Sequence, residues 1–263
     1  LSSSASLELL IGVIVNDIFN EGKIDRVELV KIGQKAENSF VGVNCGIMDQ
    51  FAVGMGRKDK AILLDCSTIK YKYAEVNLGE NCLVIMNTNK RRALNESKYN
   101  ERRAECDEAI SIIKKSRDIE NLCDLTAEEF EVVEGTILKY NIKKRATHAV
   151  YENERVKKAF DCLNSGDLEQ FGKLLVESHN SLRDLYEVTG VELDTIVEEA
   201  INAPGCIGAR MTGAGFGGCA IAVVDKNKVD SFILSVKKGY MDKIGYEPDF
   251  YLSGIGEGTQ EIK

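Results

Sequence analysis

At residues 42–51 the chain reads Gly42-Val43-Asn44-Cys45-Gly46-Ile47-Met48-Asp49-Gln50-Phe51. This stretch places one carboxylate, Asp49, among small residues and three large apolar side chains that favour burial. Asp49 is therefore expected at a partly desolvated position, where a carboxylate is either held by donors or poised to take a proton from a bound group. The two glycines would let a ligand approach the backbone closely. On this stretch alone, a helix cap or a satisfied buried aspartate is the plainer interpretation.

The composition is that of a globular protein with a large core. The 263 residues are 44% hydrophobic and 29% charged, which suits one or two domains. The net charge of −8 argues against a nucleic-acid or anionic-membrane surface. No apolar run reaches the ~18–20 residues of a membrane span. The eight cysteines are scattered without a CxxC pair, which predicts reduced, mostly buried thiols in a cytoplasmic protein and no zinc site or disulfide framework.

The chain begins with a serine run at residues 1–6, followed by a predicted helix over about 5–20. Six side chains at helical spacing are expected to form its apolar face: Leu7, Leu10, Ile11, Ile14, Val15 and Ile18. Backbone N–H groups, hydroxyls and the positive end of the helix dipole converge on the serines, an arrangement that suits phosphate. A plain serine N-cap, worth about 1 kcal/mol, is the alternative, and both interpretations stay open.

The next helix is predicted to begin near Asp25, with Glu28 three residues later in a capping-box-like pair. It runs toward Glu37, which alone would be an ordinary surface glutamate. Residues 60–66 read as a buried strand and residues 71–75 as a more exposed one.

A further strand is predicted at residues 83–89, where it ends in polar residues. Serine and glycine become rarer beyond this point and charged helices take over. The change in composition predicts a domain boundary near residue 80, with domains at 1–80 and 81–263.

The second half is predicted to be mainly helical. Helices are expected over residues 95–115, 145–160, 168–186 and 191–200, with short helical pieces between 117 and 140. His148 and His179 lie in no metal-ligand pair and in no Ser/His/Asp order, so both are interpreted as structural.

A glycine-rich stretch at 208–218 leads into an apolar, β-branched strand at 219–224. Its glycines formally match GxGxxG, but that dinucleotide motif has to open a helix, so we reject the match. A helix over 226–243 and a strand over 246–251 complete the pattern. We predict an α+β fold whose second half is a helix-backed antiparallel sheet.

Taken together, several long motifs resemble the galactokinases, sugar kinases of the GHMP superfamily. The similar stretches follow in the family's order: 1–6, 34–38, 46–50, 87–89, 97–103, 178–188 and 211–218. The resemblance covers essentially the whole chain. It implies a two-domain GHMP-kinase-like architecture, ATP and Mg²⁺ as cofactors, and phosphorylation of D-galactose at its anomeric hydroxyl to galactose 1-phosphate, the Leloir pathway.

The resemblance also implies roles for individual residues. Asp49 would be the catalytic carboxylate that accepts or orients the proton of the anomeric hydroxyl, and it would contact the sugar together with Gly46 and Tyr99. Ser4 and Glu37 would bind Mg²⁺, a pair of hard oxygen ligands that suits this ion.

For the nucleotide, the resemblance places Leu1, Ser2, Ser3 and Ser4 on the ATP phosphates. The loop of residues 213–218 would pack over the active site and support the phosphate loop and Asp49. Phosphoryl transfer needs positioning and charge neutralisation more than covalent catalysis, which agrees with these assignments.

Galactokinases have roughly a third of their chain upstream of the position of Leu1. That part holds an arginine, sugar-gripping acidic and histidine residues, and the first glycines of the phosphate loop. We therefore expect an N-terminally truncated chain with an incomplete N-terminal domain, no galactokinase activity of its own and a tendency to self-associate. Truncation should expose apolar faces at residues 62–64.

Two other functions stay open on the sequence. One is an N-acetylgalactosamine kinase or another sugar 1-kinase on the same fold. The other is a non-catalytic sensor that binds sugar and ATP and signals to a protein partner. The serine run, Glu37 and Asp49 favour an enzyme.

Overall fold

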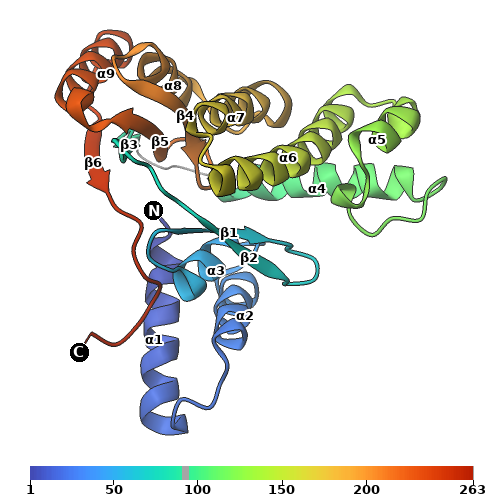
Figure 1. Cartoon of the computed structure of the whole chain (residues 1–263). Coiled ribbons are helices and arrows are strands. Elements are labelled where there is room, and N and C mark those ends of the chain that lie inside the picture. The colour runs from blue at the N-terminus through green and yellow to red at the C-terminus, as the bar shows by residue number, and fades with distance from the viewer. Residues whose placement is uncertain (91–94, 263) are drawn as a thin grey trace. The chain divides into compact units, whose positions relative to one another are not determined.

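The computed structural model describes residues 1–90 and 95–262, and for residues 95–97 the backbone alone (Figure 1). The chain divides into two compact units. Unit 1 comprises Leu1–Asn77 and the tail Gly254–Lys263, and unit 2 comprises Leu78–Ser253. The assignment of 1–80 and 81–263 to an N-terminal and a C-terminal domain stays a prediction.

Unit 1 packs three helices and a two-stranded antiparallel sheet around a small core. Its elements are α1 (Ser3–Asn20), α2 (Arg26–Ala36), the π-helix η1 (Glu37–Val41), α3 (Met48–Met55), β1 (Lys60–Leu64) and β2 (Tyr71–Glu75). The core side chains are Leu9, Val13, Leu29, Val30, Ile47 and Phe51. Asp25 caps α2 by accepting the Val27 N–H at 2.8 Å, whereas Glu28 pairs with Lys31 and does not complete the predicted capping pair.

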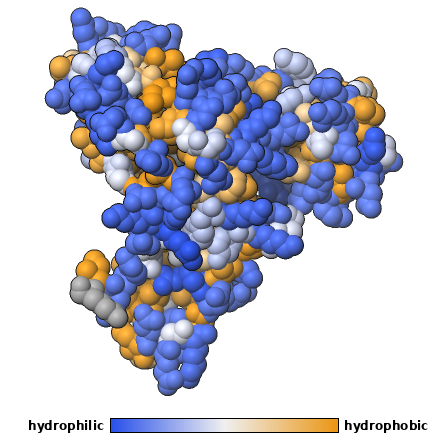
Figure 2. Space-filling model, viewed as in Figure 1, coloured by the Kyte–Doolittle hydropathy of each residue, from blue (hydrophilic) through white to orange (hydrophobic). Residues whose placement is uncertain are grey.

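The predicted apolar face of α1 is wrong. The helix forms, but its buried residues are Ala5, Leu9, Val13 and Asn16, and Leu9 and Val13 lie on a different face from the one expected. The six expected side chains are 46–67% exposed. Figure 2 shows orange, hydrophobic atoms over the part of the surface where α1 lies. Apolar residues lie on almost every side of this helix, so their spacing in the sequence could not predict which side faces the core.

The C-terminal tail is part of unit 1. The Gly258 N–H donates to the Gly56 carbonyl and the Thr259 N–H to the Val53 carbonyl, each at 2.8 Å. Arg26 Nη1 donates to the Thr259 carbonyl at 2.5 Å. The tail therefore fastens the end of α3 to the start of α2.

Unit 2 contains a four-stranded antiparallel sheet in the order β4-β5-β3-β6. The strands are β3 (Asn81–Asn87), β4 (Cys206–Thr212), β5 (Cys219–Asp225) and β6 (Asp249–Ser253). The core between this sheet and its helices includes Val84, Ile196, Ala222, Phe232 and Tyr240. The predicted helix-backed antiparallel sheet and the α+β class are confirmed.

The helices of unit 2 are α4 (Asn95–Ile113), α5 (Ala127–Val133), α6 (Tyr140–Ser165), α7 (Leu168–Ser181), α8 (Val191–Asn202) and α9 (Val229–Ile244). Short turns are the 3-10 helices η2 (Leu122–Asp124), η3 (Glu134–Thr136) and η5 (Lys226–Lys228), and the π-helix η4 (Leu182–Tyr186). Helices α4, α5 and α6 share a second core around Phe130 and Ile142. Thr126 and Glu129 form the capping box of α5.

Helix α7 lies directly on strand β4 because neither has a side chain at the contact. A Cβ at Gly208 would stand 2.2 Å from the Gly172 carbonyl oxygen, and a Cβ at Gly172 would stand 2.4 Å from the Ile207 carbonyl oxygen. Strand β4 was not predicted, because its glycine and small residues made it resemble the loop that follows.

Two further expectations need correction. Residues 60–64 form a strand, but all five are only half-buried. The cysteines are all free, but one is buried, two are exposed and five are intermediate, so the expectation that they are mostly buried is wrong. Among the described residues, no helix has both the length and the apolar character needed to cross a membrane.

Both histidines are buried in unit 2, in line with a structural role. His179 Nδ1 accepts the Met211 N–H at 3.2 Å, which ties α7 to the end of β4. His148 Nδ1 lies 2.8 Å from Ser181 Oγ, and its ring stacks on Tyr186 at 4.5 Å.

The pKa of His148 makes unit 2 acid-sensitive. Burial lowers this pKa to about 4, whereas the unfolded chain titrates near ~6.5. Between these values the unfolded chain binds a proton that the folded chain does not, so stability falls as the pH falls through this window. The free energy of unfolding can be measured by urea denaturation at several pH values. Between about pH 7 and pH 4.5 it should fall by up to ~3 kcal/mol less in His148→Gln than in the parent chain. If the free energy of unfolding of the variant falls with pH as steeply as that of the parent chain, His148 is not the cause of the acid sensitivity.

Candidate functional site in unit 1

Three helices converge on one face of unit 1. They are close together at Gly33 of α2, where a Cβ would stand 3.2–3.3 Å from side-chain atoms of Leu9 and Glu8 on α1 and Gln50 on α3. A side chain at position 33 would require its neighbours on α1 and α3 to shift. This glycine therefore brings the start of α1, the end of α2 and the first turn of α3 together.

Glu37 lies where α2 passes into η1, and it is only 8% exposed. Its carbonyl accepts the N–H groups of Gly42 at 2.9 Å and Val43 at 3.2 Å, which closes a π-type turn. Gly42 ends that turn with φ 89°, a conformation suited to glycine. Short π-helical segments often occur at functional sites, because the extra residue redirects side chains.

Glu8 and Gln50 complete a polar cluster around Glu37. Gln50 Nε2 donates to Glu8 Oε2 at 3.2 Å. Burial raises the pKa of Glu8, the hydrogen bond from Gln50 opposes the rise, and the neighbouring Glu37 carboxyl, within hydrogen-bonding reach, raises it again. Two carboxyl groups therefore meet on this face.

The Gln50 side chain, 2% exposed, also carries a buried oxygen without a partner. Among the described residues, its Oε1 atom accepts no hydrogen bond. A buried carbonyl oxygen without a partner is a costly arrangement unless a donor or cation approaches it. The cluster is thus a set of hard oxygen atoms of the kind that Mg²⁺ prefers.

The segment between η1 and α3 is fixed beside α2. Gln34 Nε2 donates to the Cys45 carbonyl at 3.2 Å, and Cys45 Sγ lies 3.3 Å from Asn38 Oδ1. Burial and the charge of Glu37 raise the pKa of the Cys45 thiol. At Gly46, no atom of the described residues beyond its two chain neighbours lies within 4 Å of the place where a Cβ would stand, so the backbone there is open to a ligand.

Asp49 is the second residue of α3 and is half-buried, as the sequence predicts. Ile47 and Phe51 on either side of it are 4% and 1% exposed. Met48 was expected to be buried but is 58% exposed. The helix turns Met48 to solvent because Ile47 and Phe51, four residues apart, already occupy the inward face.

The serine run forms the first turn of α1. Ser2 adopts a left-handed conformation with φ 48°, and its side chain makes no capping hydrogen bond. Its carbonyl accepts both the N–H and the hydroxyl of Ser6 at 2.9 Å. The N–H groups of a first helical turn lack partners within the helix, so the geometry required for anion binding is present.

Ser4 is exposed on α1, one turn before Glu8. Residues four apart lie on the same side of a helix, so Ser4 shares the side on which Glu8 contacts Glu37. Leu1 and Ser3 are also exposed. Within the described residues there is no group of three or more His, Cys, Asp or Glu side chains arranged to hold a metal ion.

Two predicted site elements belong to unit 2. Tyr99 is half-buried on α4. The loop of residues 213–218 connects β4 to β5, and four of its residues are glycines with positive φ: Gly213, Gly215, Gly217 and Gly218. Within unit 1, Glu37 and the first turns of α1 and α3 lie together through the contacts of Glu8 and Gln50.

Glu8 and Gln50 were not singled out from the sequence. The available signals were their positions, since Glu8 follows Ser4 at helical spacing and Gln50 follows Asp49. Both residue types are common on helix surfaces, so these signals could not distinguish them from solvated side chains. The assigned roles of Leu1, Ser2, Ser3, Ser4, Glu37, Gly46, Asp49 and Tyr99 stay predictions.

Comparison with known proteins shows to which class of protein this chain belongs. Residues 1–57 match the family model described as GHMP kinases N terminal domain, and residues 159–241 match that described as GHMP kinases C terminal. The crystal structure of L. major mevalonate kinase in complex with R-mevalonate shares the fold, with a TM-score of 0.62 at 17% identity over 98% of this chain and 67% of that one. The molecule is a GHMP kinase, a class of enzymes that use ATP.

Relatives of higher sequence identity show to which family of GHMP kinases the chain belongs. The chain is 64% identical over 262 residues to the galactokinase of Clostridium tetani, covering 100% of this chain and 67% of that protein. It matches the Lactococcus lactis galactokinase complexed with galactose at 52% identity and a TM-score of 0.97, again over 100% of this chain and 67% of the other. The chain belongs to the galactokinase family, whose enzymes act in galactose metabolism.

Proposed function

We propose that this chain carries the catalytic part of an enzyme that transfers the γ-phosphoryl group of ATP to the anomeric hydroxyl of D-galactose, giving galactose 1-phosphate. The observation that carries the proposal is its 64% identity to a galactokinase over its whole length. A cytoplasmic location is part of the proposal, supported by eight free cysteines.

Asp49 is proposed as the group that takes or orients the hydroxyl proton. Its half-buried position on the first turn of α3 keeps the carboxylate accessible while the backbone holds it rigidly. Gly46 leaves room for a sugar next to it, and Tyr99 is proposed as a further sugar contact. A positioned base of this kind contributes on the order of 10²–10⁴-fold to the rate.

Leu1, Ser2, Ser3 and Ser4 are proposed to receive the ATP phosphates at the N-terminus of α1. Ser4 and Glu37 are proposed to hold Mg²⁺, which would neutralise charge on the transferred phosphoryl group. The fit is supported by the oxygen atoms around Glu37, including the unpartnered Oε1 of Gln50. A nucleotide site made of backbone N–H groups is also consistent with the net charge of −8.

The first prediction concerns Asp49. In a chimera where these 263 residues replace the matching part of the C. tetani galactokinase, Asp49→Asn should lower kcat by about 10²–10⁴-fold, because the amide cannot accept the hydroxyl proton. Turnover is measured with galactose and with N-acetylgalactosamine, which also tests the sugar preference. Asp17→Asn, an exposed change on α1, serves as the control. An Asp49→Asn chimera with full turnover would refute the role.

The turnover of the chimera also serves as the reference for the activity of the isolated chain. We propose that the 263 residues alone do not phosphorylate galactose, and the support is the exposure of Ser4, Gly46 and the apolar side of α1. Turnover by the isolated chain at the level of the chimera would contradict this.

The second prediction concerns the metal. Glu37→Gln in the chimera should raise the Mg²⁺ concentration for half-maximal turnover by about 10- to 100-fold, because a charged ligand is lost. Glu21→Gln at the other end of α1, an exposed residue paired with Lys23, should leave this concentration unchanged. Equal Mg²⁺ dependence of both variants would remove Glu37 from the metal site.

The third prediction concerns self-association of the chain through α1. Each apolar side chain buried in such a contact stabilises it by about 1.5–3 kcal/mol, and seven large ones are exposed on this helix. Light scattering after gel filtration should show a mass that rises with concentration, and the double variant Ile11→Lys, Ile14→Lys should stay monomeric. Leu138→Lys, at a residue of unit 2 that is 91% exposed, is the matched control. A monomeric parent chain at all concentrations would exclude the contact.

A further inference from the structure

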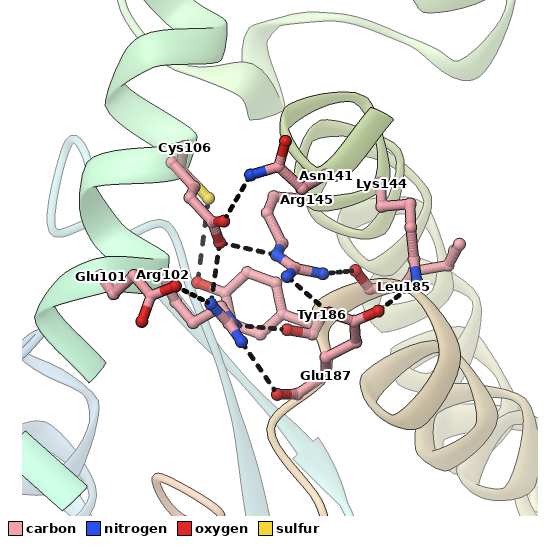
Figure 3. A network of polar contacts seen from close by, with 10 residues as sticks. Glu101, Arg102, Cys106, Asn141, Lys144, Arg145, Leu185, Tyr186 and Glu187 are labelled. Atoms are coloured by element: carbon pink, nitrogen blue, oxygen red, sulfur yellow. Dashed lines mark hydrogen bonds and ion pairs between the residues drawn. The ribbon is translucent and has the colours of Figure 1, made fainter. Parts of the chain in front are cut away.

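Two arginines of unit 2, the buried Arg145 and the half-buried Arg102, donate to three consecutive backbone carbonyls. Arg145 on α6 donates from Nη1 to the Leu185 carbonyl at 2.6 Å. Arg102 on α4 donates from Nε to the Tyr186 carbonyl at 2.9 Å and from Nη2 to the Glu187 carbonyl at 3.5 Å. Figure 3 shows both guanidinium groups directed at this turn from different helices. The carbonyls at the end of η4 thus receive charged donors.

One carboxylate holds both arginines. Glu105 Oε2 accepts from Arg145 Nε at 2.7 Å and from Arg102 Nη1 at 3.0 Å, while its Oε1 accepts from Asn141 Nδ2 at 2.9 Å. Burial alone would raise the pKa of Glu105, but the hydrogen bonds of Arg145 and Asn141 and the charges of both arginines hold it below its usual value. Glu105 is 8% exposed and remains ionised at neutral pH.

The turn that these groups hold is conformationally demanding. Glu187 has φ 57° and ψ 52°, the left-handed region that non-glycine residues seldom occupy. Its carboxylate accepts from Arg145 Nη2 at 2.7 Å and also pairs with Lys144. The next N–H, that of Val188, donates to the Leu182 carbonyl at 3.1 Å. Side chains from two helices therefore fix the direction of the Val188 carbonyl.

That carbonyl is the contact for the middle of the glycine-rich loop. Val188 O accepts the Phe216 N–H at 2.6 Å. Gly215 has φ +83°, and a Cβ there would stand 2.1 Å from Val188 O, so the loop lies directly against the turn. Phe216 itself is held at φ 57°.

The end of the loop is held independently. Thr88 donates to the Gly218 carbonyl from its N–H at 2.9 Å and from its hydroxyl at 2.8 Å. At Gly217, a Cβ would stand 2.9 Å from the Lys90 side chain, which pairs with Glu192 at 2.8 Å. A disturbance of the arginine cluster should therefore affect the middle of the loop more than its end.

We propose that Glu105 is a positioning residue for the loop of residues 213–218, acting through Arg102 and Arg145 on the Val188 carbonyl and through it on the Phe216 N–H. The proposal about loop position stands on the contacts alone. Its consequence for phosphoryl transfer rests on the proposed function, in which this loop supports the active site.

Hydrogen exchange of the 263-residue chain tests the proposal without reference to activity. Glu105→Gln keeps the shape of the side chain but removes the charge that holds two arginines. The amide of Phe216, followed by NMR, should exchange about tenfold faster, as expected for one weakened charge-assisted contact. The amides of β3 and β5 should keep their rates. Glu108→Gln on the same helix, whose partner Lys139 is exposed, should change neither.

A second pair of variants separates positioning from general stability. Arg102→Lys keeps a positive charge near Glu105, but a lysine cannot donate to the carbonyls of both Tyr186 and Glu187. This variant should therefore also show faster exchange of the Phe216 amide. Gly215→Ala disturbs the loop from the other side, so combining it with Glu105→Gln should add little further exchange at Phe216. Faster exchange throughout β3 and β5, failure of both Glu105→Gln and Arg102→Lys to fold, or an unchanged exchange rate of the Phe216 amide would each overturn the proposal.

Discussion

Unit 2 depends on one close backbone contact, that of α7 with β4. Gly172 and Gly208 allow the helix to lie on the strand without intervening side chains. The contact aligns two chain segments that follow it. The first is the end of α7, where His179 accepts the Met211 N–H and η4 leads to the 187–188 turn. The second is the end of β4, where the glycine-rich loop begins. The turn and the loop meet at Val188 because their parent elements are fixed to each other.

The carboxylates of the two units have opposite electrostatic surroundings. In unit 2, Glu105 is surrounded by two arginines and an amide, so its charge is neutralised within the fold. In unit 1, Glu8 and Glu37 lie together, and among the described residues neither forms an ion pair with a lysine or arginine. Gln50 supplies one N–H and leaves its own oxygen unpartnered. Carboxylates gathered without positive charge cost stability, and such sites commonly bind a cation or a proton when they act.

Much of the fold could be predicted from local patterns. The α+β class, the long helices and strand β5 have strong periodic or apolar signals, and Thr126 marks the start of α5 by its capping box. The buried side of α1 could not be predicted, because Leu9 and Val13 compete with six other apolar residues. Strand β4 was missed because its one glycine, Gly208, packs against α7 and does not form a turn. The half-buried position of Asp49 was predicted from its apolar surroundings. Glu8 and Gln50 were not, because their roles arise from tertiary contacts that leave no local pattern.

The return of the tail from Gly254 to the first unit makes that unit discontinuous in sequence. The carbonyls of Val53 and Gly56 find their partners in residues synthesised about two hundred positions later. Unit 1 is therefore completed only after all the strands of unit 2 have been synthesised. The tail thus contacts the helices that hold the proposed phosphate and sugar site, although it lies far from them in the sequence.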